Sequence, residues 1–404
     1  TMRPWQVVIL IIVLAFFAIS SGWKVLYILA YVLMALLVFS WLWSRLSLRK
    51  LEFQRTASSG RVQVGETFDE RLILDNLSTL PKLWVQVSDG SDLPGHRAGY
   101  VASMGGRKRA LWRARCRCLL RGRFTLGPVV VTSGDPFGLF SQQKTLAGTQ
   151  DLLVLPRVYD LSHFILFTGG LPGRGNSPRR ALQATTNAMT IREYVSGDAL
   201  SRIHWRSSAH FNKLMVKEFD LDPAVDVWLF LDLHEDVQSG EGVHSTEEYG
   251  VTIAASIAIH LLQQGLAVGL VTNGEKRELL NLDRGDRQVE RVLELLAVVT
   301  AGPGPDLKEA LSMDGFHFGR NAVAIVITPS NSQDWHGSLR HLQLRGVQVA
   351  VVGLHAATFD GQPADEDALA LLEGAGVPII QVNKGDAIAQ VLESGSDAYA
   401  VKRR

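Results

Sequence analysis

Two long apolar runs near the N-terminus constrain the fold of this chain more than any other feature. The first run extends from Trp5 to Ser20, and the second extends from Val25 to Trp43 and is interrupted only by Ser40. A membrane-spanning helix needs about 20 apolar residues, with a lower limit of about 17. The second run fits this length and the first lies at its short edge. We therefore expect a helical hairpin in the membrane, with its turn at 20–24.

The charges that flank the two runs predict the orientation of this hairpin. Arg3 precedes the first run, whereas Arg45, Arg49 and Lys50 follow the second. Because basic flanks stay on the cytoplasmic side, both ends of the hairpin and the soluble remainder are expected in the cytoplasm. The expected location is the cell (inner or plasma) membrane, with a multi-pass chain. A signal peptide cleaved after 18–20 is the alternative, and the second run would then still anchor the protein.

Length, charge and cysteine content set broad limits on the function. The 404 residues leave room for two or three domains. The 41 basic and 40 acidic residues give a net charge of +1, which does not indicate a nucleic-acid partner. The two cysteines, Cys116 and Cys118, are spaced to face the same side of one strand, where they are poorly placed to bridge each other. We expect both to be reduced, small and buried.

The hydrophobic pattern has a period of two from Leu51 to about Gln150. Alternating strands are expected at 61–64, 72–74, 83–88, 110–119 and 124–132, with glycine-, proline- and asparagine-rich turns between them. Short strands at this spacing predict an antiparallel β-sandwich-like domain over 49–150, after the hairpin at 1–48. A glycine- and arginine-rich stretch at 169–180 follows. Its composition is typical of an exposed loop. It lacks the Lys-Ser or Lys-Thr that follows the glycines of a phosphate-binding loop.

The last third of the chain alternates strands with helices. The near-continuous apolar run at 225–233 predicts a strand buried on both faces. Further strands are expected at 267–272, 322–328, 347–353 and 378–382, and helices at 246–264, 287–299, 334–345 and 366–375. Repeated units of this kind predict an α/β, doubly wound parallel sheet over 223–396, followed by a short tail at 397–404.

Ligands of such sheets bind at the carboxyl ends of the strands, which directs attention to 232–236. This segment reads Asp232-Leu233-His234-Glu235-Asp236, so it offers oxygen and nitrogen ligands that suit Mg²⁺ or Mn²⁺. A solvated acidic loop is the favoured interpretation. Another strand end, at 328–330, carries no carboxylate. No Gly-x-Ser-x-Gly turn or cysteine–histidine pair indicates a nucleophile, so no enzymatic activity is expected.

The expected third region, at 151–222, contains the loop at 169–180 and the polar segment at 192–219, which is rich in arginine and aromatic residues and leads to the first buried strand. Asp198 is expected to cap a helix that runs to about His210, and 213–219 returns to strand-like alternation. One interpretation is a surface for anions or nucleic acid. The favoured one is that the arginines pair with nearby acidic residues and that Trp205 packs between domains. The candidate residues of this segment, for partner binding or structure, are Arg192, Tyr194, Gly197, Asp198, Arg202 and Trp205.

The same residues carry a resemblance to a known family. The run Tyr194-x-x-Gly197-Asp198, then Arg202-x-His204-Trp205, Ala209 and Leu214-x-Val216, resembles the signature of the domain-of-unknown-function 58 family. Its members carry an upstream motif similar to 121–128 (Arg-Gly-Arg-Phe-x-Leu-Gly-Pro) and 135–140 (Asp-Pro-Phe-Gly-Leu-Phe). The resemblance covers essentially the whole chain. It implies a transmembrane hairpin, a β-sandwich-like domain and a von Willebrand factor A-like domain. It also implies association with MoxR-type AAA ATPases in cell-envelope or complex-assembly systems.

The chain departs from metal-binding A domains at the first strand end. Those domains carry Asp-x-Ser-x-Ser, whereas only Asp232 matches here and both serines are missing. The metal site, at Asp232 and Asp236, is therefore expected to be degenerate, with Mg²⁺ as the only cofactor considered.

These observations favour a membrane-anchored, non-enzymatic binding or adaptor protein. Its expected partners are the lipid bilayer, a MoxR-type AAA ATPase and other membrane proteins, with no nucleic acid. The alternative is a divalent-metal-dependent ligand-binding protein or hydrolase that uses the strand-end rim at Asp232.

Overall fold

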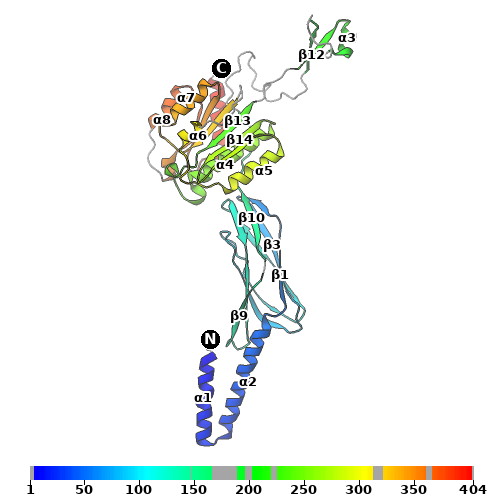
Figure 1. Ribbon diagram of the computed structural model, residues 1–404, viewed down its shortest axis with the longest axis vertical. Helices are drawn as coiled ribbons and strands as arrows, with labels where there is room; N and C mark the ends of the chain where they lie inside the picture. The colour runs from blue at the N-terminus through cyan, green and yellow to red at the C-terminus, as the bar shows by residue number, and fades with distance from the viewer. Residues whose placement is uncertain are drawn as a thin grey trace. The chain divides into compact units, whose positions relative to one another are not determined.

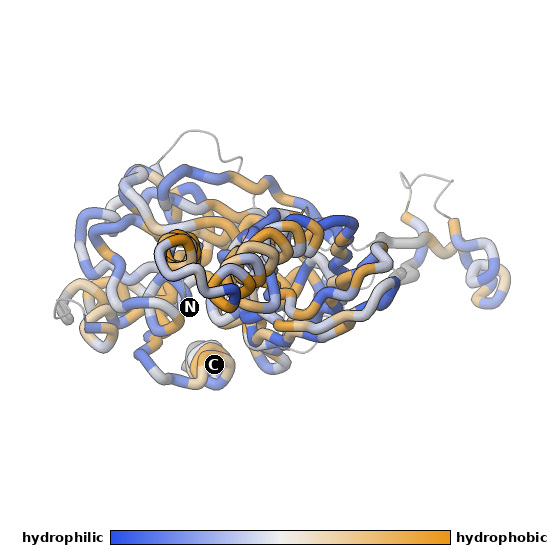
Figure 2. Tube along the Cα trace, turned by 90° about the horizontal axis from the view of Figure 1, so that it is seen from below, coloured by the Kyte–Doolittle hydropathy of each residue, from blue (hydrophilic) through white to orange (hydrophobic). Residues whose placement is uncertain are grey.

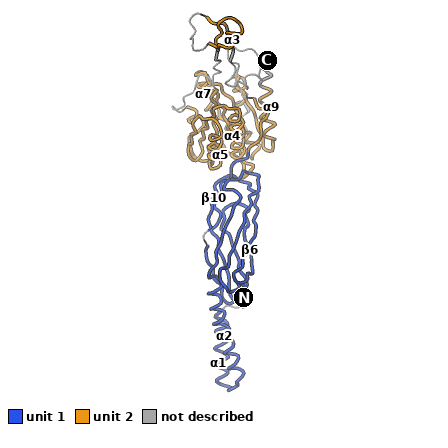
Figure 3. Tube along the Cα trace, turned by 90° about the vertical axis from the view of Figure 1, so that its right-hand side faces the viewer, with its two compact units in different colours: residues 1–157 blue, residues 158–404 orange. Residues whose placement is uncertain are grey.

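The computed structural model describes residues 4–146, 148–165, 189–195, 203–219, 225–312, 322–360 and 366–402. The chain forms two compact units, Thr1–Arg157 and Val158–Arg404 (Figure 3). The first unit ends just after strand β10 (Gln150–Leu155), which lies beyond the end expected for the β-rich region. The predicted glycine-rich loop at 169–180 lies outside the described residues.

Both N-terminal apolar runs form helices, as predicted. Helix α1 (Pro4–Ser21) and helix α2 (Lys24–Ser47) lie side by side, and they are predominantly hydrophobic along their length (Figures 1 and 2). Each is long and apolar enough to cross a membrane, and only 11% of each apolar window is buried. Their length and exposed apolar surface fit a membrane anchor.

Helix α2 continues almost directly into the β-rich part of the same unit. Leu48 and Leu51, on either side of the connection, both belong to the core of the β-rich region. Lys82, which is 1% exposed, donates a hydrogen bond of 2.8 Å from Nζ to the backbone oxygen of Leu46. Burial lowers the pKa of Lys82. A cation at this position satisfies a free carbonyl in the last turn of α2 and complements the helix dipole.

Three small sheets build the β-rich region. Their strand orders are β1-β3-β6, β5-β4-β8-β9 and β2-β10-β7. The strands other than β10 are β1 (Leu51–Ala57), β2 (Arg61–Gln63), β3 (Thr67–Asn76), β4 (Lys82–Asp89), β5 (Tyr100–Met104), β6 (Arg109–Arg117), β7 (Gly122–Leu126), β8 (Val129–Gly134) and β9 (Ser141–Leu146). All pairings are antiparallel except β2 with β10, which is parallel.

Alternation along the strands forms the core of this region, as the period of two predicted. Leu72 and Leu74 of β3 share one buried cluster with Val87 of β4 and Val131 of β8, so two of the sheets face each other. Cys116 and Cys118 are buried free thiols in a second cluster, as expected.

The expectation of one strand over 124–132 is wrong. Strands β7 and β8 are separate and belong to different sheets. The chain turns between them at Gly127-Pro128, where Gly127 adopts a φ of 91°. Proline has no backbone N–H to donate to a sheet, so this dipeptide ends one strand and begins another.

A six-stranded sheet forms the core of the second unit, with strand order β15-β14-β13-β16-β17-β18 (Figure 1). Five strands are parallel, as predicted: β13 (Asp226–Leu231), β14 (Ala267–Asn273), β16 (Ala322–Thr328), β17 (Gln348–Leu354) and β18 (Ile379–Val382). The edge strand β15 (Arg277–Asp283) is antiparallel to β14 and was not expected. The chain changes direction across the sheet between β13 and β16.

Helices cover both faces of this sheet. Val227, Leu229 and Leu231 of β13 share one core with helices α4 (Thr246–Gln263), α5 (Asp286–Val298) and α9 (Ile388–Lys402). Trp228 and Phe230 share the opposite core with α6 (Leu307–Ser312), α7 (His336–Leu344) and α8 (Glu366–Gly374). A strand buried on both faces explains why its sequence is almost continuously apolar.

Candidate functional site

Asp232 lies at the point where three neighbouring strands of the large sheet end. It follows β13, and its carboxylate accepts hydrogen bonds from the side chains that end β14 and β16. Asn273 Nδ2 donates to Oδ1 over 2.9 Å, and Thr328 Oγ1 donates to Oδ2 over 2.6 Å. The backbone N–H of His234 adds a third bond, to Oδ1, of 3.2 Å. A hydrogen-bonded carboxylate thus lies at the point where the strand order reverses, which is where doubly wound sheets usually bind ligands.

The Asp232 side chain is almost completely enclosed. The residue is 2% exposed, and burial raises the pKa of its carboxyl group, while the hydrogen bonds from Thr328, Asn273 and His234 oppose that rise. The same network continues outwards, because Asn273 Nδ2 also donates to the backbone oxygen of Pro305 over 3.0 Å. Asp232 therefore joins three strand ends and a loop inside the protein.

The other acidic residues of this rim are exposed, whereas Asp232 is buried. Glu235 and Asp236 lie on a short 3-10 helix, η2 (Glu235–Val237), and the Asp236 side chain is 82% exposed. Asp236 Oδ2 lies 3.8 Å from His234 Nδ1. Within the described ranges, the predicted rim does not form a group of three side chains close enough to share a metal ion. Thr328 ends a strand that carries no carboxylate, and it is a direct hydrogen-bond partner of Asp232.

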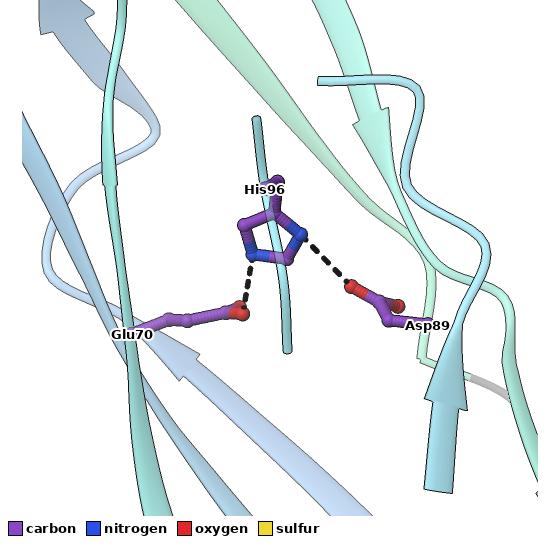
Figure 4. A group of neighbouring side chains, drawn as sticks. All are labelled: Glu70, Asp89 and His96. Atoms are coloured by element: carbon purple, nitrogen blue, oxygen red, sulfur yellow. Dashed lines mark hydrogen bonds and ion pairs between the residues drawn. The ribbon is translucent and has the colours of Figure 1, made fainter. Parts of the chain in front are cut away.

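A group with metal-ligand chemistry occurs elsewhere, inside the β-rich region. Glu70, Asp89 and His96 approach one another from three separate segments, with potential ligand atoms all within 4.8 Å (Figure 4). The His96 ring lies between the two carboxylates, with Nε2 2.7 Å from Glu70 Oε1 and Nδ1 3.3 Å from Asp89 Oδ2. All three side chains are at most 3% exposed.

Arg55 decides how this group is interpreted. Its guanidinium lies 3.2 Å from Glu70 Oε2 and 2.6 Å from Asp89 Oδ1. Arg55 thus contacts both buried carboxylates directly and supplies them with a permanent positive charge. A divalent cation at the same place would have to sit beside a buried arginine. We interpret the group as a buried ion network that fixes the core, since charges at such depth need partners.

The segment with the family signature forms a small folded hairpin, called here the signature hairpin (189–195 and 203–219). Strand β11 (Met189–Glu193) pairs antiparallel with β12 (Met215–Phe219), and helix α3 (Trp205–Phe211) lies between them in sequence. The prediction of a helix that starts at Asp198 is wrong, because Ile203 pairs with β12 as an isolated bridge and α3 begins only at Trp205. The expected strand near 213–219 is confirmed.

His204 and Ser208 explain part of the signature in structural terms. His204 caps α3, because its Nδ1 accepts a hydrogen bond of 3.1 Å from the backbone N–H of Ser207. Ser208 is buried, and its hydroxyl accepts a bond of 2.8 Å from the backbone N–H of Met215. The histidine and the serine thus hold the helix against strand β12.

The predicted site residues of the signature fall into three groups. Tyr194 is half-buried at the end of β11, and Trp205 is 69% exposed at the start of α3. Arg192 lies within β11, opposite Val216 of β12. Gly197, Asp198 and Arg202 lie outside the described residues. Their role in partner binding or structure stays a prediction.

The second part of the upstream motif, at 135–140, forms a tight turn between β8 and β9. Asp135 is 1% exposed, and its carboxylate accepts backbone hydrogen bonds from Phe137 (2.9 Å) and Phe140 (2.6 Å). The aspartate therefore has a structural task. It leaves Phe137 exposed at the tip of the turn, at 55%.

Comparison with known proteins places these features in a family context. The family described as "Protein of unknown function DUF58" matches residues 190–357. The protein YeaD of Bacillus subtilis (strain 168) is 23% identical over 363 residues, which cover 86% of this chain and 87% of YeaD.

Likeness to solved structures is partial. The CARDB domain of the PF1109 protein from Pyrococcus furiosus matches 26% of this chain and 91% of its own, at 13% identity and a TM-score of 0.20. Proximal thread matrix protein 1 from the mussel byssus matches 44% of this chain and 48% of its own, at 13% identity and a TM-score of 0.31. The sequence comparisons reach further, because the chain is similar to YeaD along most of its length. The DUF58 match begins in the signature hairpin and ends within η4 (Ala356–Phe359). It includes the signature that begins at Tyr194, whereas the upstream motif at 121–140 lies outside it.

Proposed function

We propose that this protein is a membrane-anchored, non-enzymatic adaptor. Helices α1 and α2 form a multi-pass anchor in the cell membrane, and the remainder of the chain is cytoplasmic. The β-rich region is a sandwich-like spacer, and the second unit is a von Willebrand factor A-like binding domain. The partner is a MoxR-type AAA ATPase, in a process of the cell envelope or of complex assembly.

The observation that carries this proposal is the exposed apolar surface of the signature hairpin. Trp205 is 69% exposed and Phe211 is 60% exposed, at the two ends of α3, and Val195 is 62% exposed beyond β11. Large aromatic side chains on a backbone fixed by hydrogen bonds are typical of protein-binding anchors. A segment that only linked two domains would not need them on its surface.

The geometry around Asp232 supports a role without catalysis. Both of its carboxylate oxygens already accept hydrogen bonds from the ends of neighbouring strands. Asp232 is also only 2% exposed, so its carboxylate has little access to a metal ion or a substrate from solvent. The strand order and the position of Asp232 beside the change of direction agree with an A-like domain in which the metal site has become a structural junction.

Binding between purified proteins tests the proposal. The full chain in detergent should bind the MoxR-type AAA ATPase of the same organism. The double variant Trp205→Ser/Phe211→Ser should weaken that binding about a hundred-fold or more, since interface aromatics often contribute 2 kcal/mol or more each. The matched control is Leu279→Ser/Leu344→Ser, at positions 46% and 80% exposed in the same unit. Equal effects of the two double variants would contradict the assignment, and no binding by the folded wild type would refute it.

A further inference from the structure

Four turns of the β-rich region gather around the C-terminal end of α2. They are the connection at 48–50, the β3–β4 loop at 77–81, the β5–β6 turn at 105–108 and the β8–β9 turn at 135–140. The backbone N–H of Leu77 donates to the oxygen of Lys50 over 2.9 Å, and that of Arg107 donates to the oxygen of Ser78 over 2.8 Å. We call this end of the β-rich region the base surface.

The β8–β9 turn belongs to the base surface through strand β4. The start of β4 lies against α2, because Lys82 donates to Leu46. The end of β8 runs beside it, with Ser133 opposite Val85 and the Ser133 hydroxyl donating to the backbone oxygen of Trp84 over 2.7 Å. The turn that follows β8 therefore lies at the same end of the region as α2 (Figure 1).

Positive charge dominates the base surface. Among the described residues, no ion pair engages its exposed cations, which are Arg45, Arg49, Lys50, Arg107, Lys108 and Lys144. They line two open hollows of about 470 and 480 Å³. Of the nearby carboxylates, Asp75 is held by Arg109 over 2.7 Å, and Glu52 lies exposed on β1. Asp135 is buried, and its carboxylate accepts two backbone hydrogen bonds. The surface therefore has an excess of positive charge that suits anionic groups.

Apolar side chains project from the same turns. Leu77 is 51% exposed, Leu80 is 39% exposed and Phe137 is 55% exposed. Near the C-terminal end of α2, the Arg45 guanidinium lies 5.0 Å from the centre of the Trp41 ring. The apolar length of this helix fits a bilayer. Tryptophan beside arginine at the end of such a helix is typical of the headgroup layer. The base surface thus presents both the charge and the apolar side chains that a membrane interface attracts.

We propose that the base surface binds the headgroups of anionic phospholipids in the leaflet where α2 ends. The phosphates lie in the two basic hollows, and Leu77, Leu80 and Phe137 enter the interface between them. This proposal rests on the membrane anchor of the proposed function. It goes beyond anchoring because it assigns lipid selectivity to the folded β-rich region.

Lipid titration of the full chain tests this proposal. The detergent-solubilised protein is titrated with dioleoyl-phosphatidylglycerol or dioleoyl-phosphatidylcholine, and bound lipid is counted by native mass spectrometry. We expect the wild type to bind phosphatidylglycerol at least ten-fold more tightly than phosphatidylcholine. The variant Arg107→Glu/Lys108→Glu/Lys144→Glu should lose this preference, since each cation near an anionic surface contributes about five-fold to affinity.

The matched control is Arg71→Glu/Arg97→Glu/Arg113→Glu, which makes the same charge change at exposed positions away from the base. It should keep the preference. Equal binding of the two lipids by the wild type, or equal loss in both triple variants, would overturn the proposal. Displacement of phosphatidylglycerol by millimolar inorganic phosphate would overturn the lipid assignment in favour of a free-phosphate site. Carbonate extraction of native membranes checks the anchor separately: wild type that stays in the pellet but shows no lipid preference refutes this inference alone.

Discussion

Replacing Asp232 with alanine tests whether this carboxylate holds the strand ends together. Three donors lose their acceptor: Asn273 Nδ2, Thr328 Oγ1 and the His234 N–H. A buried donor left unpaired costs about 1–3 kcal/mol, and relief from burying the carboxylate offsets part of the sum. We expect a net loss of about 3–5 kcal/mol in the free energy of unfolding of the second unit.

Thermal unfolding of the full chain in detergent measures this loss. The tryptophans Trp228 and Trp335, which are 5% and 2% exposed, report on the core of the unit. For a unit of this size the melting temperature falls by about 2–4 °C per kcal/mol, so Asp232→Ala should melt about 6–20 °C below the wild type. Asp236→Ala, at a side chain that is 82% exposed, should change stability by less than about 0.5 kcal/mol. An Asp232→Ala melting temperature within about 2 °C of the wild type would refute the structural role.

The pH dependence of Asp232→Asn provides an independent check. The pKa of Asp232 is raised in the folded protein, whereas the unfolded value is about 3.9. The folded state therefore holds this proton more tightly, and the contribution of Asp232 to stability is lost as pH rises through the window between the two pKa values. The asparagine variant lacks this titration. Its melting temperature relative to the wild type should rise from about pH 4 upwards and then level off, and a fall would contradict the raised pKa.

Three further predictions concern the β-rich unit. Glu70→Gln should lower its free energy of unfolding by about 3–5 kcal/mol, because the change leaves Arg55 buried beside a reduced counter-charge; denaturant titration measures this loss. Asp135→Ala removes the acceptor of two backbone N–H groups, so hydrogen exchange in the β8–β9 turn should become faster while α1 and α2 are unchanged. Burial raises the pKa of Cys118 to about 11. Its thiolate fraction is then about a hundred-fold or more below that of an unfolded thiol, and rapid iodoacetamide labelling of folded protein at pH 8 would contradict the buried thiol.

Local sequence patterns predicted most of the regular structure. The five parallel strands of the large sheet are almost continuously apolar because helices cover both faces, and such runs are visible in the sequence without knowledge of the partner strands. Strand β15 escaped prediction because it lies at an edge and is largely exposed, so its sequence alternates only weakly. Strand β11 is likewise hard to predict, since it forms only by pairing with β12, which is distant in sequence.

The buried ion network was missed because its members come from four separate segments. The sequence nevertheless contains a signal of buried charge. Arg55, Glu70 and Asp89 each occupy a position that continues the inward-facing alternation of its strand, as Glu70 does between Phe68 and Leu72. A charge at an inward position of an alternating strand indicates a buried partner. The identity of that partner depends on how the strands pack, which no local pattern contains.

The hydrogen-bond partners of Asp232 could likewise not be predicted from local sequence. Its position at a strand end was correctly identified from the apolar run before it. Its partners Asn273 and Thr328 end two other strands, and their side chains accept or donate hydrogen bonds without titrating near neutral pH. A search for metal ligands and nucleophiles therefore passes over them, although they determine what the carboxylate does.

The short connection between α2 and the β-rich region has a mechanical consequence. Because Leu48 and Leu51 pack in the core and Lys82 holds the last turn of α2, the junction contains no flexible linker that could absorb a rotation of the helix. In the proposed membrane anchor, a thinner or thicker bilayer would change the tilt of α2, and this rotation would pass directly to the strands of the β-rich region. Bilayer thickness would then act on the orientation of the whole β-rich region without any ligand.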